Sequence, residues 1–370
     1  MKIIYIHPSQ LSKRWLQYYC LDNLQNIFDI EYWDCSAIAK PGFKAIQVET
    51  RPYLISIKNT NDFVANLERI PKDSLIVNDM HLNAGNYHLY MILAKYFQHR
   101  IYINFFANTQ GAYKNKILSK LASSSIKDII CYFLIRIKFK FYVLSSKQNS
   151  KNKIYRINHP DYEQYKNIIK TSNSLYKFDY IVYVDNYFPF HPEIKKREPH
   201  FNPIKAAPLF YNSLNSFFGE IEKTYKCKVI IAAHPSSCYE TNPFNGRTII
   251  YNQTCELIRN CKAVCMHTSN ALSYVILFNK PIALLSNRGF RQSQLEYKRL
   301  NNIAKQLSLN IIDTDNLLNI KSIFNFINNN FSSFYKRIYL IGDEHKNNTE
   351  LFIKYFNDIY KTMYLKKQKK

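Results

Sequence analysis

The sequence predicts an α/β protein made of two consecutive units, each built around a parallel sheet. Short apolar segments alternate with helical patterns in the first 110 residues, and the alternation restarts near residue 178. Such alternation is typical of parallel strands joined by helices. The length of 370 residues agrees with two units, because it exceeds one typical core and suits two domains of ordinary size.

The first half shows this alternation from its beginning. The predicted elements, in order, are a strand in "KIIYIHPS", a helix in "SKRWLQYYCLDNL", a strand in "DSLIVNDMHLN", a helix in "NYHLYMILAKYF" and a strand in "RIYINFFAN". Residues 113–157 differ, because Lys is mixed there with Ile, Leu and Phe and acidic residues are few.

The second half repeats the pattern with clearer strands. Its predicted elements are a strand in "DYIVYVDNYFPFHPE", a helix in "NSLNSFFGEIEKTY", a strand in "CKVIIAAHPSS", a helix in "QTCELIRNC", a strand in "KAVCMHTSN", a helix in "NALSYVILF" and a strand in "KPIALLSNR". Two α/β halves that meet near residue 170 describe the chain most simply.

The charge balance favours anionic partners. Lys and Arg number 51 against 27 Asp and Glu, which gives a net charge of +24. Such an excess suits nucleic acid, phospholipid head groups or phosphorylated and carboxylated substrates. The eight cysteines form no C-x-x-C pair, and the spacing of Cys255, Cys261 and Cys265 is not a common zinc pattern. We therefore expect reduced thiols and no metal site.

The sequence also predicts a cytoplasmic location. The N-terminal apolar run is too short for the hydrophobic region of a signal peptide, and no apolar segment reaches the roughly 20 residues that span a bilayer. A helical "IKFKFYVLS" segment and the "KKQKK" tail would suit peripheral contact with the inner face of the cytoplasmic membrane. Solvated Lys-rich faces are the alternative interpretation of both segments.

The dipeptide His-Pro occurs four times, and the copy at His234 stands out. It follows the strand "VIIAA", while Thr268, Ser269 and Asn270 follow the strand "AVC" and its histidine. Loops at the carboxyl ends of parallel strands open on one edge of the sheet. Thr268, Ser269 and Asn270 are good helix caps, so we expect a helix start that binds a phosphate together with His234. The copies at His7 and His159 are predicted to be turns.

This second half resembles a known family. The run "AAHPSS…NGR…CELIRNCKAVCMHTSNALSYVILFNKPIALLS" is similar to the nucleotide-sugar half of bacterial GT-B glycosyltransferases of the sialyltransferase-like and Kdo-transferase-like kind, which build capsule and lipopolysaccharide. The resemblance covers roughly residues 178–290. It implies two Rossmann-like domains that face each other across a cleft. By position, His234 matches the His-Pro histidine of the family, and Thr268 and Ser269 match its Ser/Thr motif.

The resemblance implies a function and a division of the chain. The expected reaction transfers an acidic sugar, a sialic acid-like nonulosonic acid or Kdo, from a CMP-activated donor to a growing surface glycan, with an oligosaccharide or lipid-linked acceptor and no cofactor. Residues 1–170 would form the acceptor domain, residues 171–345 the nucleotide-sugar domain, and residues 346–370 a final helix and basic tail. The expected nucleotide-binding residues are His234, Pro235, Ser236, Gly246, Arg247, Glu256, Thr268, Ser269 and Asn270.

Two carboxylates are candidates for the sugar chemistry. Asp79 follows an apolar strand and could act as base for the acceptor hydroxyl, although Asn78-Asp79-Met80 stands where the family has an acidic-acidic-Gly pattern. Asp185 lies at a strand exit with His191 just beyond, and it is the position that would match an Asp of retaining Kdo-transferase-like enzymes. The sequence favours Asp185 slightly over Asp79, offers His191 as a further catalytic candidate, and leaves the stereochemical outcome open. Arg247 and Arg288 could pair with a phosphate or with the sugar carboxylate, although a surface salt bridge is the alternative for each.

Three other functions are compatible with parts of the sequence. A transferase that moves glycerol- or ribitol-phosphate from a CDP donor would also use histidines in such a frame. A basic nucleic-acid-binding protein would explain the charge, but no zinc-finger, RNP or helix-turn-helix pattern supports it, so no nucleic acid is expected. A decayed transferase that acts as an assembly partner is the non-catalytic alternative.

Overall fold

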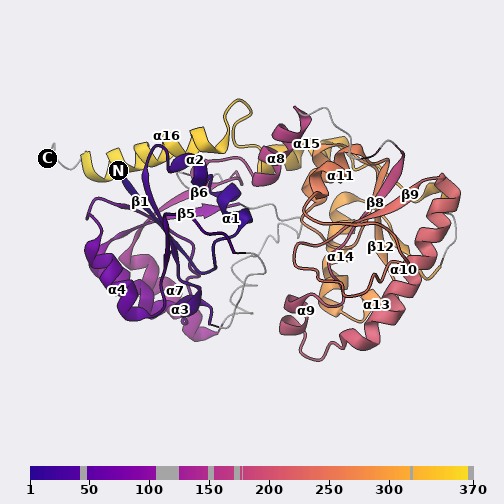
Figure 1. Ribbon diagram of the computed structural model, residues 1–370, viewed down its shortest axis with the longest axis horizontal. Coiled ribbons are helices and arrows are strands. Elements are labelled where there is room, and N and C mark those ends of the chain that lie inside the picture. Colours follow the sequence, from indigo (N-terminus) through magenta and orange to yellow (C-terminus); the bar gives the residue numbers. More distant parts are fainter. Residues whose placement is uncertain are drawn as a thin grey trace. The chain divides into compact units, whose positions relative to one another are not determined.

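The protein folds into two compact α/β units (Figure 1). The computed structural model describes residues 1–41, 48–105, 125–148, 154–170, 176, 178–316 and 320–365. Among these, the first unit contains the residues that precede Asp161 and those from Ile341 onward, and the second unit contains Asp161–Leu340. The prediction of two units with parallel sheets is confirmed.

The first unit is built on a seven-stranded parallel sheet with the strand order β3-β2-β1-β4-β5-β6-β7. Its strands are β1 (Lys2–His7), β2 (Asp29–Asp34), β3 (Leu54–Ser56), β4 (Leu75–Asn78), β5 (His99–Asn104), β6 (Lys140–Ser145) and β7 (Ile154–Arg156). Its helices are α1 (Lys13–Tyr18), α2 (Leu21–Leu24), α3 (Ser36–Ala39), α4 (Thr60–Arg69), α5 (Tyr87–Tyr96), α7 (Ile126–Lys138), α16 (Asn348–Tyr360) and the π-helix η3 (Lys361–Leu365).

Side chains that alternate along β1 form two separate cores, one on each face of the sheet. Ile3 and Tyr5 join the core that is covered by α1, α2 and α16. Ile4 and Ile6 join the core that is covered by α4, α5 and α7. Figure 1 shows α2 and α16 on one side of β1 and α4 and α7 on the other.

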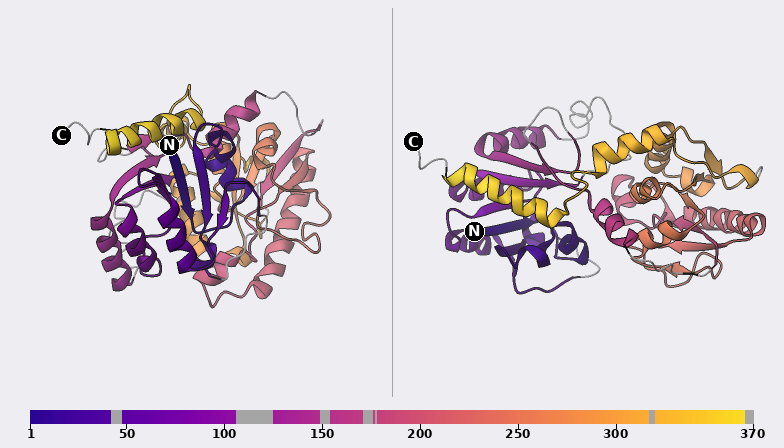
Figure 2. Two further views of the ribbon diagram at one scale, coloured as in Figure 1. Left: turned by 60° about the vertical axis from the view of Figure 1, so that its left-hand side comes forward. Right: turned by 90° about the horizontal axis from the view of Figure 1, so that it is seen from above.

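The C-terminal helix α16 belongs to the first unit, and a buried asparagine anchors the chain that leads into it. Asn158 Oδ1 accepts from the backbone N–H groups of Gly342 and Asp343, both at 2.8 Å, and Asn158 Nδ2 donates to the Lys346 carbonyl at 2.8 Å. Asn158 also exchanges two hydrogen bonds with the side chain of Asn348. Beyond this anchor, α16 lies along the first sheet (Figure 2) and buries its apolar residues there.

The second unit is built on a six-stranded parallel sheet with the order β10-β9-β8-β11-β12-β13. Its strands are β8 (Tyr180–Val184), β9 (Lys228–Ala232), β10 (Ile249–Ile250), β11 (Ala263–Met266), β12 (Ile282–Ser286) and β13 (Ile311–Asp313). Its helices are α9 (Pro192–Arg197), α10 (Pro203–Tyr225), α11 (Thr254–Asn260), α12 (Leu272–Leu277), α13 (Arg288–Arg291), α14 (Gln294–Leu307), the 3-10 helix η1 (Ile320–Ser322), α15 (Asn329–Tyr335) and the π-helix η2 (Lys336–Leu340). The helix α8 (Pro160–Ile169) begins at the boundary between the units.

The observed division differs from the expected one in two places. The expected first domain ends at residue 170 and the expected tail comprises residues 346–370. The observed boundary falls at Asp161, and the chain from Ile341 packs with the first unit. The anchor at Asn158 explains the second difference, because it binds the start of this C-terminal segment directly.

The expectation of a helix over "IKFKFYVLS" is wrong for most of that segment. Helix α7 ends at Lys138, and Lys140–Ser145 forms β6. Tyr142 and Leu144 are buried in the first core, as expected for β-formers that alternate with period two. The "KKQKK" tail, residues 366–370, lies outside the described residues. In the part of the chain that the structure describes, no helix is both long and apolar enough to cross a bilayer.

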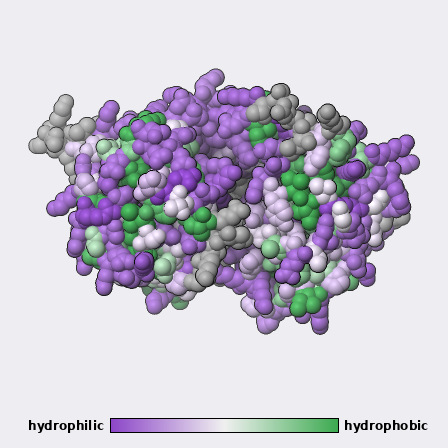
Figure 3. Space-filling model, in the orientation of Figure 1, coloured by the Kyte–Doolittle hydropathy of each residue, from purple (hydrophilic) through white to green (hydrophobic). Residues whose placement is uncertain are grey.

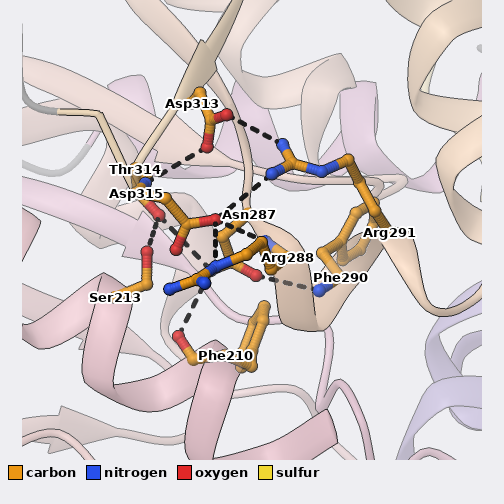
Figure 4. A network of polar contacts seen from close by, with 9 residues as sticks. All are labelled: Phe210, Ser213, Asn287, Arg288, Phe290, Arg291, Asp313, Thr314 and Asp315. Atoms are coloured by element: carbon orange, nitrogen blue, oxygen red, sulfur yellow. Dashed lines mark hydrogen bonds and ion pairs between the residues drawn. The ribbon is translucent and has the colours of Figure 1, made fainter.

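In the second unit, a network of polar contacts fixes the loop after β12 to its neighbours (Figure 4). Asn287 caps α13, because its Oδ1 accepts from the backbone N–H of Phe290 at 2.8 Å. Its Nδ2 donates to the Phe210 carbonyl in α10 and to Thr314 Oγ1 after β13. These bonds hold α13 so close to α10 that only glycine fits at position 289: a Cβ there would lie 2.5 Å from the backbone nitrogen of Phe210.

We predict that Gly289→Ala lowers the free energy of unfolding by about 3 kcal/mol, because the added methyl group meets backbone atoms that cannot move independently. Gly219→Ala is the matched control. It lies in α10, a Cβ there meets nothing within 4 Å, and the same change should stabilise the protein by about 0.5–1 kcal/mol. Urea unfolding of both variants checks the prediction, and equal stability of the two would contradict it.

Candidate active site

In the second unit, the candidate residues gather at the carboxyl ends of three parallel strands. In the sheet, β8 lies between β9 and β11. His234 follows β9, Asp185 and Asn186 follow β8, and Thr268 follows β11. The prediction that the loops of His234 and Thr268 open on the same edge of one sheet is therefore confirmed.

The His-Pro sequence fixes the tautomer of His234. The backbone N–H of Ser236 donates to His234 Nδ1 at 3.1 Å. Because Pro235 has no N–H, Ser236 carries the first amide after the ring that can make this bond. Nδ1 must then carry a lone pair, and in the neutral ring the proton is on Nε2. The half-buried imidazole thus presents Nε2–H as a hydrogen-bond donor.

The same turn recurs at two other His-Pro sequences. Glu193 N–H donates to His191 Nδ1 at 3.2 Å. His7 Nδ1 lies 3.2 Å from the Ser9 N–H and 3.1 Å from the Ser9 carbonyl oxygen. The turn alone therefore does not distinguish a binding histidine from a structural one.

His191 lies directly beside His234. The centres of the two rings are 4.9 Å apart and their planes meet at 76°. Burial lowers the pKa of His191, and protonation of its Nδ1 would also break the bond from Glu193. In both rings of the pair, Nδ1 therefore accepts a hydrogen bond from a backbone N–H.

Asp185 is buried beneath this pair, and both of its carboxylate oxygens are engaged. Tyr239 Oη donates to Asp185 Oδ2 at 2.7 Å, the His234 N–H approaches the same oxygen at 3.5 Å, and the Tyr187 N–H donates to Oδ1 at 2.9 Å. Burial raises the pKa of Asp185 to about 6, although these hydrogen bonds partly offset the effect. This geometry favours a positioning role for Asp185 over contact with a substrate.

The loop after β11 is tied to its surroundings through Thr268. Its hydroxyl donates to Glu296 Oε2 at 2.9 Å and accepts from Asn186 Nδ2 at 3.3 Å. Glu296 is buried and also pairs with Arg299. Thr268 thus connects the loops after β8 and β11 with α14.

The expectation that Thr268, Ser269 and Asn270 cap the following helix is wrong. The N-cap of α12 is Ala271, and the helix has six residues. Ser269 Oγ accepts from the Ala271 N–H at 3.2 Å, so the preceding residues form a turn. The phosphate site expected from a helix start therefore has no support here, whereas contact of these side chains with a nucleotide stays a prediction.

The expected arginines have protein partners. Arg247 donates to both carboxylate oxygens of Glu222, at 2.7 and 3.1 Å, and to Asn215. Its neighbour Gly246 adopts a positive φ of 74°, which suits glycine in the turn that leads to this pair. Arg288 lies 3.6 Å from Asp315. These contacts are those of a structural ion pair and a surface salt bridge.

Pro235 and Glu256 complete the expected nucleotide-binding set. Pro235 is exposed at the turn after His234. Glu256 lies in the first turn of α11, and its Oε2 is buried with no hydrogen-bond partner among the described residues. It therefore retains the capacity to accept a hydrogen bond, and its role stays a prediction.

In the first unit, Asp79 lies where the strand order reverses, between the ends of β1 and β4. Tyr19 Oη donates to Asp79 Oδ2 at 3.1 Å, and His7 Nε2 lies 3.4 Å from the same oxygen. The His7 side chain is only 2% exposed, whereas that of Asp79 is 24% exposed. Burial raises the pKa of Tyr19 well above its usual range, so its hydroxyl stays a donor. The carboxylate of Asp79 thus has Tyr19 and His7 as buried partners and remains partly exposed to solvent.

Arg100 fixes the loop that carries Asp79. Its guanidinium donates to the carbonyls of Asn78 and Met80, at 2.8 and 2.9 Å, and so binds the residues that precede and follow Asp79. Asn78 Oδ1 accepts from the Met80 N–H, and Tyr90 Oη donates to the Met80 carbonyl. Asp79 therefore stands on a rigid loop with a defined direction.

Sequence reasoning missed several residues of both groups. The sequence predicts only a turn at His7, although His7 ends a strand and has the same His-Pro pattern as His234, and that pattern is the available signal. The sequence does not indicate Tyr19 or Glu296, because Tyr19 bonds to Asp79 and Glu296 to Thr268, and both partners are distant in sequence. The described residues contain no cluster of His, Cys, Asp and Glu that could hold a metal ion.

Comparisons with known proteins support the fold. No family model and no curated protein matches the chain. Among solved structures it is similar to CalG4, the calicheamicin glycosyltransferase, with a TM-score of 0.53, 10% identity and 98% of each chain covered. It is also similar to the UDP-GlcNAc 2-epimerase of Methanocaldococcus jannaschii (TM-score 0.47, 11% identity, 97% and 100% covered) and to SnogD of Streptomyces nogalater (0.47, 10%, 96% and 99%). The likeness to CalG4 shows that the chain has the GT-B fold.

We predict that Asp185 makes the protein less stable as the pH rises from about 4 to about 6. Its pKa is near 6 when folded and 3.8 in the free side chain, so the folded state holds the proton more tightly. Stability is thus higher below pH 4 and falls as the group ionises, by about 3 kcal/mol. Asp185→Asn should remove this slope from denaturation curves measured between pH 4 and 7.

His99 and His267 have lowered pKa values, so they make stability rise with pH. Because wild type and variant both contain them, their contribution cancels in the difference between the two curves. A second variant, Tyr239→Phe, removes a hydrogen bond that lowers the pKa of Asp185, so it should retain the slope and move its upper end to higher pH. Parallel curves for wild type and Asp185→Asn would contradict the assignment.

Proposed function

We propose that the protein is a glycosyltransferase whose second unit binds a nucleotide-activated sugar and whose first unit supplies the base that activates the acceptor. The observation that carries the proposal is the pair of imidazoles at the end of β9 and before α9, on the edge of a GT-B sheet where parallel strands end. The carboxylate of Asp79, which directly follows β4 in the first unit, is the second support.

The imidazole pair suits a phosphate group. Both rings have Nδ1 engaged by a backbone amide, so the neutral form of each ring carries its N–H at Nε2. Ring centres 4.9 Å apart allow one phosphate to accept a hydrogen bond from each. As the sugar leaves, negative charge grows on that phosphate, and preorganised donors stabilise it without rearrangement. Asp185 acts here through the backbone of His234, as a positioning residue.

The reaction then follows as a direct displacement. The acceptor hydroxyl gives its proton to Asp79, and its oxygen forms a bond to the anomeric carbon of the donor sugar. The bond from that carbon to the phosphate oxygen breaks, and its electron pair stays on the released nucleotide. A single displacement inverts the configuration at the anomeric carbon. Burial of Asp185 disfavours the alternative, in which that carboxylate attacks the sugar.

The finer proposal is a CMP-linked acidic sugar as donor and a bacterial surface glycan, as an oligosaccharide or linked to lipid, as acceptor. The similarity of the His234 and Thr268 motifs to those of CMP-sugar enzymes supports it, and so does the net charge of +24, which suits a carboxylated donor. The other nucleotide sugars are direct competitors, so the donor must be identified by experiment.

We predict that CMP-linked acidic sugars raise the melting temperature of the protein and that His234→Asn abolishes the effect. Asn can still accept the Ser236 amide and keep the turn, but it lacks the donor at the Nε2 position. The same variant should lose about 100-fold or more in kcat/KM. The measurements are thermal unfolding with CMP-, UDP- and dTDP-sugars and CDP-glycerol, followed by product analysis with the ligands that bind.

His200→Asn, which changes an exposed histidine of the same unit, is the control and should behave like wild type. Protection by UDP- or dTDP-sugars alone would keep the transferase and overturn the CMP donor. Protection by CDP-glycerol alone, with transfer of polyol phosphate, would overturn the glycosyltransferase itself.

We predict further that Asp79→Asn lowers kcat by about 100-fold or more and leaves protection by the donor unchanged, because the amide cannot take the acceptor proton. Asp29→Asn, on an exposed carboxylate of the same unit, should leave both unchanged. Full activity of Asp79→Asn would refute its role as base.

A further inference from the structure

Helix α7 exposes a continuous apolar stripe. The exposed fractions of its large apolar side chains are Ile126 78%, Ile130 53%, Phe133 59%, Leu134 43% and Ile137 80%. Their spacing of four, three, one and three residues keeps all of them on one face of the helix. No other helix of the described residues carries such a set, and the remaining exposed apolar side chains are spread over many elements.

The stripe is not a misplaced core face. The opposite side of α7 is the one that packs on the first unit, where Cys131 and Ile135 are buried, with Ile135 in the core beneath. The helix is therefore already anchored, and its outward face carries the larger apolar side chains. On the face of the molecule that Figure 3 shows, most of the surface is hydrophilic and the hydrophobic residues form small separate groups.

Cations border the stripe on both sides. At about 100° per residue, Arg136 falls on one edge, and Lys127 and Lys138 fall on the other. All three are exposed. The carboxylate of α7, Asp128, is turned to the helix start, where it accepts from the backbone N–H of Ala84 at 2.8 Å.

The sequence around α7 is also strongly basic. Asp128 is the only acidic residue between Asp79 and Asp161, a stretch with thirteen Lys and Arg residues. An apolar stripe bordered by long basic side chains is the pattern of helices that lie in the plane of a bilayer surface, where the cations reach the head groups. The attraction to anionic lipids adds to the burial of the apolar face.

We infer that α7 is a membrane-docking helix that binds the surface of an anionic bilayer. Self-association through this face would bring identical cations together in a symmetric contact, which opposes a second copy as the occupant. Nucleic acid would leave the apolar stripe unmatched. The inference rests on α7 alone and does not depend on the proposed function, so the failure of one leaves the other standing.

The test is co-sedimentation of the full chain with vesicles of phosphatidylcholine alone or mixed with phosphatidylglycerol. We expect binding to the anionic vesicles, weaker binding at high salt and little binding to the neutral ones. The triple variant Ile130→Ser, Phe133→Ser, Ile137→Ser should reduce the partition coefficient at least ten-fold. These side chains are exposed, so the fold should tolerate the changes.

A matched control variant is available elsewhere on the chain. Ile27→Ser, Ile204→Ser and Phe326→Ser replace the same residue types at exposures of 53%, 77% and 62%, close to those of Ile130, Ile137 and Phe133. This control should bind vesicles like wild type. Equal loss in both triple variants, or no binding of wild type to anionic vesicles, would overturn the inference.

Two further measurements test whether the basic side chains contribute to binding and whether a second copy of the chain covers the stripe. Lys127→Gln with Lys138→Gln should weaken binding to anionic vesicles, whereas Lys58→Gln with Lys305→Gln, at exposed positions outside α7, should not. Sedimentation without lipid should give the same mass for wild type and the α7 triple variant. A wild-type dimer that this variant converts to monomer would show that a second copy covers the stripe and would overturn the inference.

Discussion

In each sheet the strand order reverses between two neighbours, β1 and β4 in the first unit and β8 and β11 in the second. At such a point the following connections leave toward opposite faces, and the strand ends between them stay accessible. The reversal sets Asp79 beside His7, although 72 positions separate them, and sets Asn186 beside Thr268. Both groups of candidate residues therefore owe their position to topology rather than to local sequence.

A second, local constraint acts on the histidines. At His191 and His234, Pro removes one amide and the next one donates to Nδ1, so in the neutral ring the turn leaves the proton on Nε2. The chemistry available to each ring is then set by its surroundings. At His7 the Nε2 atom faces the carboxylate of Asp79, and at His234 the neighbouring group is a second imidazole. One backbone motif thus precedes a carboxylate contact in one unit and a histidine pair in the other.

The sequence was sufficient for features that depend on short-range pattern. The apolar runs before His234 and Asp79 became β9 and β4, and the shared edge of the His234 and Thr268 loops followed from parallel strands alone. The sequence failed where partners come from distant elements. Arg247 has the charge that a phosphate needs, but Glu222 of α10 neutralises it. Asp185 has the position of a nucleophile, but Tyr239 and the backbone enclose it.

The packing of α16 over β1 has a consequence for biosynthesis. Ile3 and Tyr5 are translated before the other described strands, whereas Phe352 and Phe356, which share their core, are translated after the described strands of both sheets. At about 5–20 residues per second, roughly 20–70 s pass between the two events. Among the described residues the second unit is one unbroken segment, Asp161–Leu340. The second unit is translated later, yet its segment is complete before α16 is made. Until then, one face of the first sheet lacks the helix that covers it.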